Sequence, residues 1–229
     1  GGYSTAQVAN LFSNERGSYF YLSPLKIIWN SVRFALATVA ISLIVGTIVS
    51  YFLAASGRRG RSASDALFML PLGVSAVTLG FGYIIAPPLG IRGSWVILVA
   101  AHSLVAYPFV IRSLLPVLRG MSPDLREAAA VLGASPTKVF ILIDLPIIAP
   151  ALLVGATFAF AVSMGEFGAS LLLVRQEFTT MPVAIFRFLG LPGAANLGSA
   201  LSMSTLLMAV VALGFVAIER FRYKGVGGF

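Results

Sequence analysis

Two ionisable side chains lie within apolar stretches of this sequence, where they could carry chemistry. Glu166 is the one charged residue between Ile147 and Val174, and His102, the chain's single histidine, lies in another such stretch. A carboxylate or imidazole inside a bilayer could contact a cargo or relay a proton. The Glu166 carboxylate could instead be structural, satisfying amides of a broken helix or pairing with an arginine, and the sequence leaves both interpretations open.

The sequence offers no recognisable catalytic or cofactor site. It contains no cysteine, so thiolate metal sites and cysteine nucleophiles are excluded. One histidine without nearby carboxylates does not make a metal site, and we expect His102 to be packed or hydrogen-bonded. No G-x-x-x-x-G-K-[ST] phosphate loop occurs, and neither does a Ser/His/Asp set or an HExxH motif. We therefore expect a protein that is not an enzyme, holds no metal or cofactor, and does not hydrolyse ATP itself.

Composition places the chain in a bilayer. Of its 229 residues 58% are hydrophobic and 10% are charged, with a mean hydropathy of +0.94, whereas soluble domains carry roughly 25% charged residues. A ~30 Å hydrocarbon core is crossed by about 20 apolar residues. We predict an all-α polytopic bundle with about five transmembrane helices, near 33–54, 66–86, 94–115, 146–167 and 198–218.

Glycine and proline interrupt the predicted spans. Pro71 and Gly73 fall in the second span, where a proline removes a backbone donor and kinks a helix. Gly165 and Gly168 flank Glu166, so we expect the fourth helix to end near Glu166. A short half-helix over 169–174 would follow, because irregular backbone at membrane depth is tolerated only within protein or beside a water-filled cavity.

The distribution of basic residues predicts an orientation. Of the 16 lysines and arginines, ten lie on one side of the predicted bundle and six on the other, and the richer side is expected to be cytoplasmic. The loop 119–146 and the tail 221–229 would then be cytoplasmic, and the segments 1–28 and 168–197 extracytoplasmic. We interpret the net charge of +8 as a topology signal and expect no nucleic-acid partner.

The loop 119–146 contains start and stop signals for two helices. Ser122-Pro123-Asp124 supplies a capping hydroxyl, a proline at the first helical position and an acid near the positive end of the helix dipole. Gly133 is the residue type favoured just past a helix end, which predicts a helix from Pro123 to Leu132. Ser135-Pro136 repeats the start signal, and we expect it to begin a second helix that runs toward the fourth span. We predict two short helices that are joined by a tight turn and lie on the membrane surface.

The first of these helices has two different faces. Leu125, Ala128, Ala129 and Leu132 follow i, i+3, i+4, i+7 spacing, and we predict that they pack on the bundle. Glu127 would project from roughly the opposite side and offer a directional charged contact to a partner. The alternative is a solvated connector that binds nothing.

A longer pattern runs through residues 127–146. It reads Glu127-Ala128-Ala129, three residues, Gly133, nine residues, Ile143, one residue, Leu145-Pro146. This spacing resembles the EAA loop of permease subunits in binding-protein-dependent ABC importers. Three further segments are similar to the same family, so that the resemblance covers residues 28–220: Asn30-Ser31, Leu70-Pro71 and Gly165-Glu166-Phe167-Gly168.

The resemblance implies a type I importer transmembrane domain over 29–220, in the inner (plasma) membrane of a prokaryote. In this family two such bundles, which can be fused, identical or distinct, form the pathway. Two cytoplasmic ATPase subunits bind ATP and drive it, and an extracytoplasmic binding protein delivers the substrate. The implied ATPase-coupling residues are Glu127, Ala128, Ala129, Ala130, Gly133, Ala134 and Ser135. The implied translocation-pathway residues are Gly165, Glu166, Phe167 and Gly168.

The cargo and the energy source remain open. The resemblance extends to the ferric iron, thiamine, sulfate, molybdate and polyamine branches, and iron or thiamine is the first expectation. Gly1 in place of a methionine suggests the second module of a fused permease or a trimmed subunit. One rival function is a proton-coupled carrier that uses Glu166 and His102, and another is a membrane enzyme or scaffold. Dependence on ATP would favour the ABC permease, and dependence on a proton gradient would favour the proton-coupled carrier.

Overall fold

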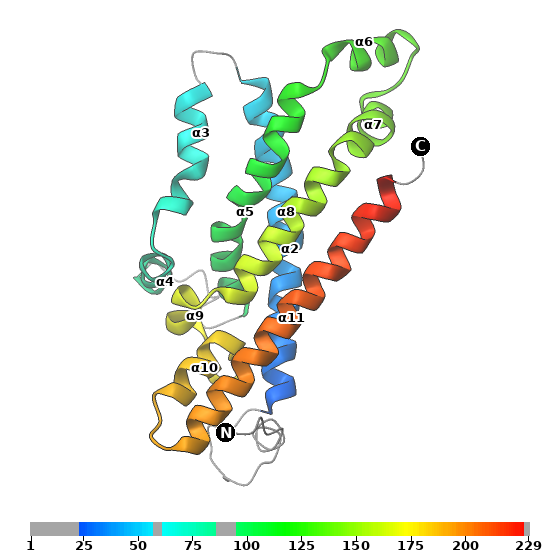
Figure 1. The fold of residues 1–229 in the computed structure, drawn as a ribbon. Helices are drawn as coiled ribbons and strands as arrows, with labels where there is room; N and C mark the ends of the chain where they lie inside the picture. The colour runs from blue at the N-terminus through cyan, green and yellow to red at the C-terminus, as the bar shows by residue number, and fades with distance from the viewer. Residues whose placement is uncertain (1–22, 57–60, 86–94, 227–229) are drawn as a thin grey trace.

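The computed structural model describes residues 23–56, 61–85 and 95–226. Every regular element within these ranges is helical, which confirms the all-α fold class. The long helices run between two ends of the molecule (Figure 1). One end carries α6 (Pro123–Val131) and the other carries α10 (Met181–Leu189). Of the predicted segment 1–28, positions 1–22 lie outside the described residues, and helix α2 begins at Pro24.

Four helical stretches of the described chain are long and apolar enough to cross a bilayer, or five if a bent pair counts as one span. The predicted spans at 33–54, 94–115, 146–167 and 198–218 all fall on them, although their boundaries differ by several residues. α5 is central and packs against both α2 and α8. The four stretches are α2 (Pro24–Ala55), α5 (Trp95–Gly120), Pro136–Gly165 and α11 (Ala194–Val226).

The second predicted span, 66–86, is wrong as a single helix. It consists of α3 (Arg61–Met69), the 3-10 turn η1 (Leu70–Gly73) and α4 (Ala76–Ile85), with a bend of 90° at the break. Pro71 stands at the start of η1, and Val74 is extended, so the helix cannot continue. α4 instead packs on α9 (Gly168–Leu173), where a Cβ added to Gly80 would lie 2.9 Å from the Ala169 Cα.

The second helix of the 119–146 loop is continuous with the fourth span, which corrects the prediction of a separate surface helix. α7 (Pro136–Val139) leads through a π-helical turn, η2 (Phe140–Asp144), into α8 (Leu145–Gly165). In this turn the Leu145 N–H bonds to the Phe140 carbonyl, five residues back. The wider turn accommodates Pro146, which lacks an N–H and would clash with the carbonyl four residues earlier in a regular helix.

The break after the fourth span is confirmed. α8 ends at Gly165 and the short helix α9 follows, close to the predicted half-helix over 169–174. The chain then forms a 3-10 turn, η3 (Gln176–Phe178), before α10. α11 returns toward the α6 end and extends to Val226, which places the first part of the predicted tail 221–229 within this helix.

The centre of the bundle depends on close approach between helix backbones. A Cβ added to Gly46 of α2 would lie 2.7 Å from the Val110 Cβ of α5, and one added to Gly155 of α8 would lie 3.1 Å from the Val110 Cα. Small residues allow such approach in lipid, where packing supplies much of the attraction between helices. Val110 is fully buried between the two glycines.

Replacing Gly46 by alanine should destabilise the bundle, because the added methyl group overlaps Val110. Overpacking of this kind costs about 1–3 kcal/mol. Thermal unfolding of the purified protein should show a lower midpoint for Gly46→Ala. Gly82→Ala is the control, since a Cβ at Gly82 has no atom within 4 Å; equal midpoints for the two variants would contradict the packing assigned to Gly46.

Candidate functional site

α6 is a short helix whose two ends are fixed by local hydrogen bonds. The Ser122 Oγ accepts from the Asp124 N–H at 3.3 Å and donates to the Asp124 carboxylate at 2.8 Å. At the other end Gly133 has φ +79°, a conformation that strains any residue with a Cβ. The Ala134 N–H then bonds back to the Ala129 carbonyl at 2.9 Å. The predicted start and stop of this helix are confirmed.

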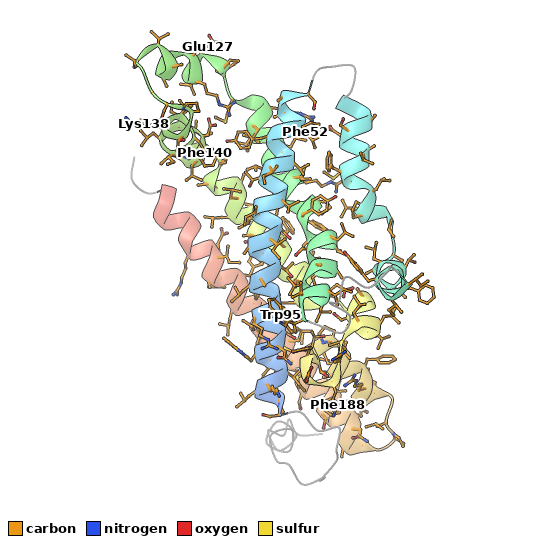
Figure 2. The ribbon with its side chains drawn as sticks, turned by 180° about the vertical axis from the view of Figure 1, so that it is seen from behind. Phe52, Trp95, Glu127, Lys138, Phe140 and Phe188 are labelled. Atoms are coloured by element: carbon orange, nitrogen blue, oxygen red, sulfur yellow. The ribbon has the colours of Figure 1, made fainter. Side chains whose placement is uncertain are left out.

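Of the α6 residues that we predicted to pack on the bundle, Ala129 is half-buried, but Leu125, Ala128 and Leu132 are exposed. Leu125 is 48% exposed and Leu132 is 87% exposed, and α6 contributes no buried residue. Arg126 and Ala129, three positions apart, are the half-buried residues. The prediction is wrong because an ion pair of Arg126 sets the rotation of the helix. Glu127 is exposed, as predicted, at the outer edge of the α6 end (Figure 2).

The ion pair of Arg126 ties α6 to two spans. The Arg126 Nε donates to Asp144 Oδ1 at 2.9 Å, and the Tyr51 hydroxyl of α2 donates to Asp144 Oδ2 at 3.1 Å. The guanidinium also lies 5.7 Å from the centre of the Tyr51 ring. The hydrogen bond to Asp144 raises the pKa of Arg126 above its usual value. The Asp144 side chain is only 7% exposed, so loss of its partners would leave a buried carboxylate unsatisfied.

The sequence interpretation missed this anchor. In the loop pattern Asp144 occupies the unspecified position between Ile143 and Leu145. Arg126 lies just before the pattern and counts only among the ten basic residues of the predicted cytoplasmic side. The available signal is an aspartate at the entry to an apolar stretch, because an acidic group at such a position needs a partner.

α6 is held over a hollow. This cavity has a volume of about 500 Å³, and Tyr51, Leu118, Arg126 and Glu127 are among its lining residues. Arg119 also lines it and pairs with Asp65 of α3 at 2.9 Å. α6 therefore stands away from the bundle core and is attached by a directional ion pair.

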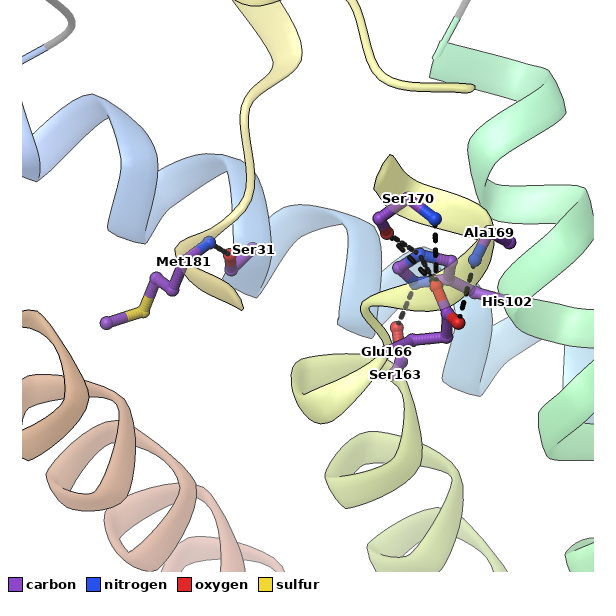
Figure 3. Close-up of polar contacts among 7 residues, drawn as sticks. All are labelled: Ser31, His102, Ser163, Glu166, Ala169, Ser170 and Met181. Atoms are coloured by element: carbon purple, nitrogen blue, oxygen red, sulfur yellow. Dashed lines mark hydrogen bonds and ion pairs between the residues drawn. The ribbon is translucent and has the colours of Figure 1, made fainter. Parts of the chain in front are cut away.

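A second polar cluster surrounds Glu166 at the break between α8 and α9 (Figure 3). The Ala169 N–H donates to Oε1 of Glu166 at 3.1 Å, and the Ser170 N–H and O–H donate to Oε2 at 3.0 and 3.1 Å. The imidazole of His102, from α5, has Nδ1 2.8 Å from the Ser163 Oγ and Nε2 2.8 Å from the Ser170 Oγ. Its Nε2 is also 3.5 Å from Glu166 Oε2.

A neutral His102 satisfies every bond of this cluster. The Ser170 O–H is directed at Glu166, so the Ser170 oxygen is free to accept from the His102 Nε2–H. Nδ1 can then accept from the Ser163 O–H. The prediction that His102 is hydrogen-bonded is confirmed. Because the Glu166 carboxylate accepts the first amides of α9, the geometry matches the structural interpretation of Glu166.

The four residues predicted to line the pathway differ in their surroundings. Gly165 is exposed, Glu166 is buried, and Phe167 and Gly168 are half-buried. The Phe167 ring lies 5.2 Å from the Phe186 ring of α10. Their assignment to the pathway stays a prediction.

Within the described part of the chain, no cluster of three or more acidic or histidine side chains could hold a metal ion.

A clamp at the α10 end joins α2 to the segment after α9. The Asn30 side-chain amide donates to the carbonyls of Glu177 at 3.0 Å and Thr179 at 3.2 Å. The neighbouring Ser31 Oγ accepts from the Met181 N–H at 2.8 Å (Figure 3). The sequence indicated Asn30-Ser31 through a resemblance alone, and the structure gives the pair a physical role, since it fixes η3 and the start of α10.

Comparison with known proteins decides the class of this bundle. Residues 42–222 match the family described as "Binding-protein-dependent transport system inner membrane component". The chain belongs to this family. It is therefore an inner-membrane permease of an ABC importer and not an enzyme, and the proton-coupled carrier is not favoured.

Relatives of known name are similar over most of the chain. The molybdenum transport system permease protein ModB of Haemophilus influenzae is 30% identical over 202 residues, which is 80% of this chain and 87% of ModB. The putative 2-aminoethylphosphonate transport system permease protein PhnV of Salmonella typhimurium is 28% identical over 78% of this chain and 68% of its own length. The sulfate transport system permease protein CysW of Escherichia coli is 33% identical over 70% of this chain and 61% of its own length.

Solved structures share the fold. A chain of a bacterial ABC transporter for import of the acidic polysaccharide alginate superposes with a TM-score of 0.72 at 16% identity, covering 97% of this chain and 84% of that one. A second structure of a bacterial alginate ABC transporter, in complex with a periplasmic protein bound to alginate pentasaccharide, gives a TM-score of 0.66 at 18% identity. At these identities the likeness concerns the fold alone.

Glu166→Ala should loosen α9, because the Ala169 and Ser170 amides lose their acceptor. Each unsatisfied buried amide costs about 1–3 kcal/mol. Hydrogen exchange over 168–173 should accelerate and the unfolding midpoint should fall, with Glu166→Gln intermediate because it keeps one acceptor oxygen. Glu177→Ala, at an exposed position of η3, is the control. Unchanged exchange in Glu166→Ala would contradict the capping role.

Proposed function

We propose that α6 and the turn after it form the surface on which a cytoplasmic ATPase drives this permease. The contact residues would be Glu127, Ala128, Ala129, Ala130, Gly133, Ala134 and Ser135. The observation that carries the proposal is the exposure of apolar side chains beyond the end of the spans, with Val131 and Leu132 each 87% exposed. A protein rarely leaves such a surface in water without a partner. Alanines allow a partner to approach closely, and Glu127 adds a directional hydrogen-bonding group.

Force applied to α6 would reach the spans through two routes. The covalent route is the tight turn at Gly133, which leads into the continuous helical run from Pro136 to Gly165. The non-covalent route is the Arg126–Asp144 pair, which bypasses the turn and contacts α2 through Tyr51. Both routes converge on the start of α8, so displacement of α6 over its hollow would rock α8 against α2 and α5.

The α6 end would face the cytoplasm and the α10 end would face outward, in agreement with the bias of the basic residues. Two ATPase subunits would bind and hydrolyse ATP at the α6 end, and a second permease bundle, whether fused, identical or distinct, would complete the pathway. An extracytoplasmic binding protein would deliver cargo at the α10 end. The solved alginate transporter bound to its periplasmic protein supports this arrangement by similarity of fold.

The cargo we propose is a small oxyanion such as molybdate, sulfate or a phosphonate. The named relatives are described as permeases for molybdenum, 2-aminoethylphosphonate and sulfate, which moves our proposal away from the iron or thiamine that the resemblance favoured. Side chains at the α10 end agree with an anion. Lys26, Arg33 and Arg187 are cationic, and in η3 and α10 the one acidic residue is Glu177.

We propose that the segment between α8 and α9 stabilises the helices that line the pathway. Its residues are Gly165, Glu166, Phe167 and Gly168. The Glu166 carboxylate binds the amides of α9, and α9 packs against α4. In this proposal residues 165–168 maintain the break between α8 and α9 at membrane depth. Gly165, which is exposed, would be the residue of this segment that contacts the pathway.

Gly133→Val should abolish uptake while the protein still folds and inserts, because it distorts the turn that carries the coupling surface. Gly193→Val is a matched control. Gly193 also has positive φ, +109° against +79° for Gly133, and neither glycine has an atom within 4 Å of an added Cβ. Uptake into proteoliposomes containing the assembled transporter should fall at least tenfold for Gly133→Val alone. Equal effects of the two substitutions would contradict the coupling role.

Uptake assays with different cargoes test the proposed substrate class. Proteoliposomes holding the transporter and its binding protein should accumulate labelled molybdate or sulfate when ATP is enclosed with the ATPase, and an excess of a phosphonate should be tested as a competitor. Ferric iron and thiamine are the comparison cargoes. ATP-dependent uptake of either, without uptake of any oxyanion, would return the assignment to those branches.

A further inference from the structure

Arg33 is a half-buried arginine. It lies on α2 at the α10 end, and within the described part of the chain its side chain forms no ion pair. Its Nε is buried and has no hydrogen-bond partner. The side chain lines a hollow of about 210 Å³ together with Phe34, Ala37 and Trp95. This volume is several times the ~30 Å³ that one water occupies in the liquid, which leaves room for a tetrahedral anion with some of its water.

Two aromatic rings hold the guanidinium in place. Its central carbon lies 4.8 Å from the centre of the Phe34 ring and 5.7 Å from that of Phe178. The two rings meet edge to face, with centres 6.2 Å apart. Phe178 is positioned in turn by Asn30, which binds the carbonyls on either side of it. Ring contacts orient a guanidinium without occupying its N–H donors, so the donors remain available to a ligand.

The position of Arg33 along α2 makes an unpaired charge costly. α2 has 32 residues, and at ~1.5 Å per residue it is about 48 Å long, whereas the hydrocarbon core is ~30 Å thick. Arg33 lies nine residues after Pro24, about 14 Å along the axis, near one boundary of that core. A half-buried cation at such a depth requires a counter-charge or water.

Among the residues that the structure describes, no acidic side chain pairs with Arg33. Glu177, the acidic residue of η3, is exposed. Arg187 donates to the Thr179 Oγ1 at 3.1 Å and therefore adds a further cation to this end. Lys26 lies seven residues before Arg33 on α2 and is exposed. The local field thus favours a negatively charged ligand.

We propose that the hollow at Arg33 binds a tetrahedral oxyanion through the Arg33 guanidinium. Arginine suits this group because its planar fork donates two parallel hydrogen bonds to one oxyanion. The same chemistry is offered by a cargo ion that enters the pathway from the α10 end and by the phosphate of a phospholipid headgroup. The first source rests on the proposed function, and it makes Arg33 the first contact of the cargo within the bundle.

Chemical modification of a cysteine at Ala37 tests the site in the assembled transporter. The chain contains no cysteine, and Ala37 lines the hollow, so Ala37→Cys reports access to it. The rates of labelling by an anionic sulfonate thiol reagent and by a cationic ammonium thiol reagent are measured in nanodiscs. We expect the ratio of anionic to cationic rate to fall about tenfold, the effect of 1.4 kcal/mol, when Arg33→Gln is added. Lys26→Gln removes the same charge from the same helix and should leave the ratio nearly unchanged.

Protection experiments identify the source of the anion. Sulfate or molybdate, compared with chloride at equal ionic strength, should slow the labelling of Ala37→Cys in a saturable way. The same ions should not slow it when Arg33→Gln is added. For the lipid source, labelling is compared in nanodiscs of phosphatidylglycerol and of phosphate-free galactolipid. Protection by lipid phosphate alone would overturn the role of Arg33 in cargo transfer. If neither the oxyanions nor the lipid phosphate protect Ala37→Cys, the site is overturned. These two comparisons use native Arg33, so they decide the question even if Arg33→Gln fails to assemble.

The uptake assay separates this inference from the proposed function. Oxyanion uptake without protection at Ala37→Cys would remove the Arg33 site and leave the proposed function standing. Protection by sulfate without uptake of any oxyanion would remove the proposed cargo and leave an anion site on α2.

Discussion

The structure depends on satisfying the backbone where a helix breaks inside the membrane. Water is absent from the hydrocarbon core, so each free amide must find a protein partner. Between α8 and α9 that partner is the Glu166 carboxylate, which accepts the Ala169 and Ser170 N–H groups. His102 links the same cluster to α5, the helix on which α2 and α8 both pack. The sequence alone allows Glu166 to be a transport residue, but in the structure its carboxylate stabilises the fold.

α8 is fixed near both of its ends by a buried carboxylate. Asp144 precedes it and binds Arg126 and Tyr51, whereas Glu166 follows it and binds α9. A helix tied in this way transmits a displacement along its axis, because its own hydrogen bonds are stiff compared with the loops around it. The π-helical turn at Phe140–Asp144 is the point where the run from Pro136 departs from regular geometry, and such turns occur often at functional sites. Any bending under load would be expected there first.

Sequence signals predicted the features whose causes are local. The cap at Ser122, the left-handed turn at Gly133 and the half-helix after Glu166 all follow from residue types within a few positions. The 90° bend between η1 and α4 does not, because it also depends on contact of α4 with Ala169, far along the chain. The predicted rotation of α6 is wrong for the same reason. Helical periodicity favours Leu125 and Leu132 as residues of the packed face. The buried Asp144 pairs instead with Arg126, and the two leucines are therefore exposed.

The cations at the α10 end oppose the rule that orients the chain. Lysine and arginine normally gather on the cytoplasmic side, and every one placed on the outer side weakens that signal. Arg33 adds a desolvation cost, since its Nε is buried and unpartnered. Solubility explains surface lysines, but it does not explain a guanidinium that contacts the rings of Phe34 and Phe178. An anion bound from the α10 end would offset the desolvation cost, because it would supply a counter-charge to Arg33 at the point where the spans begin.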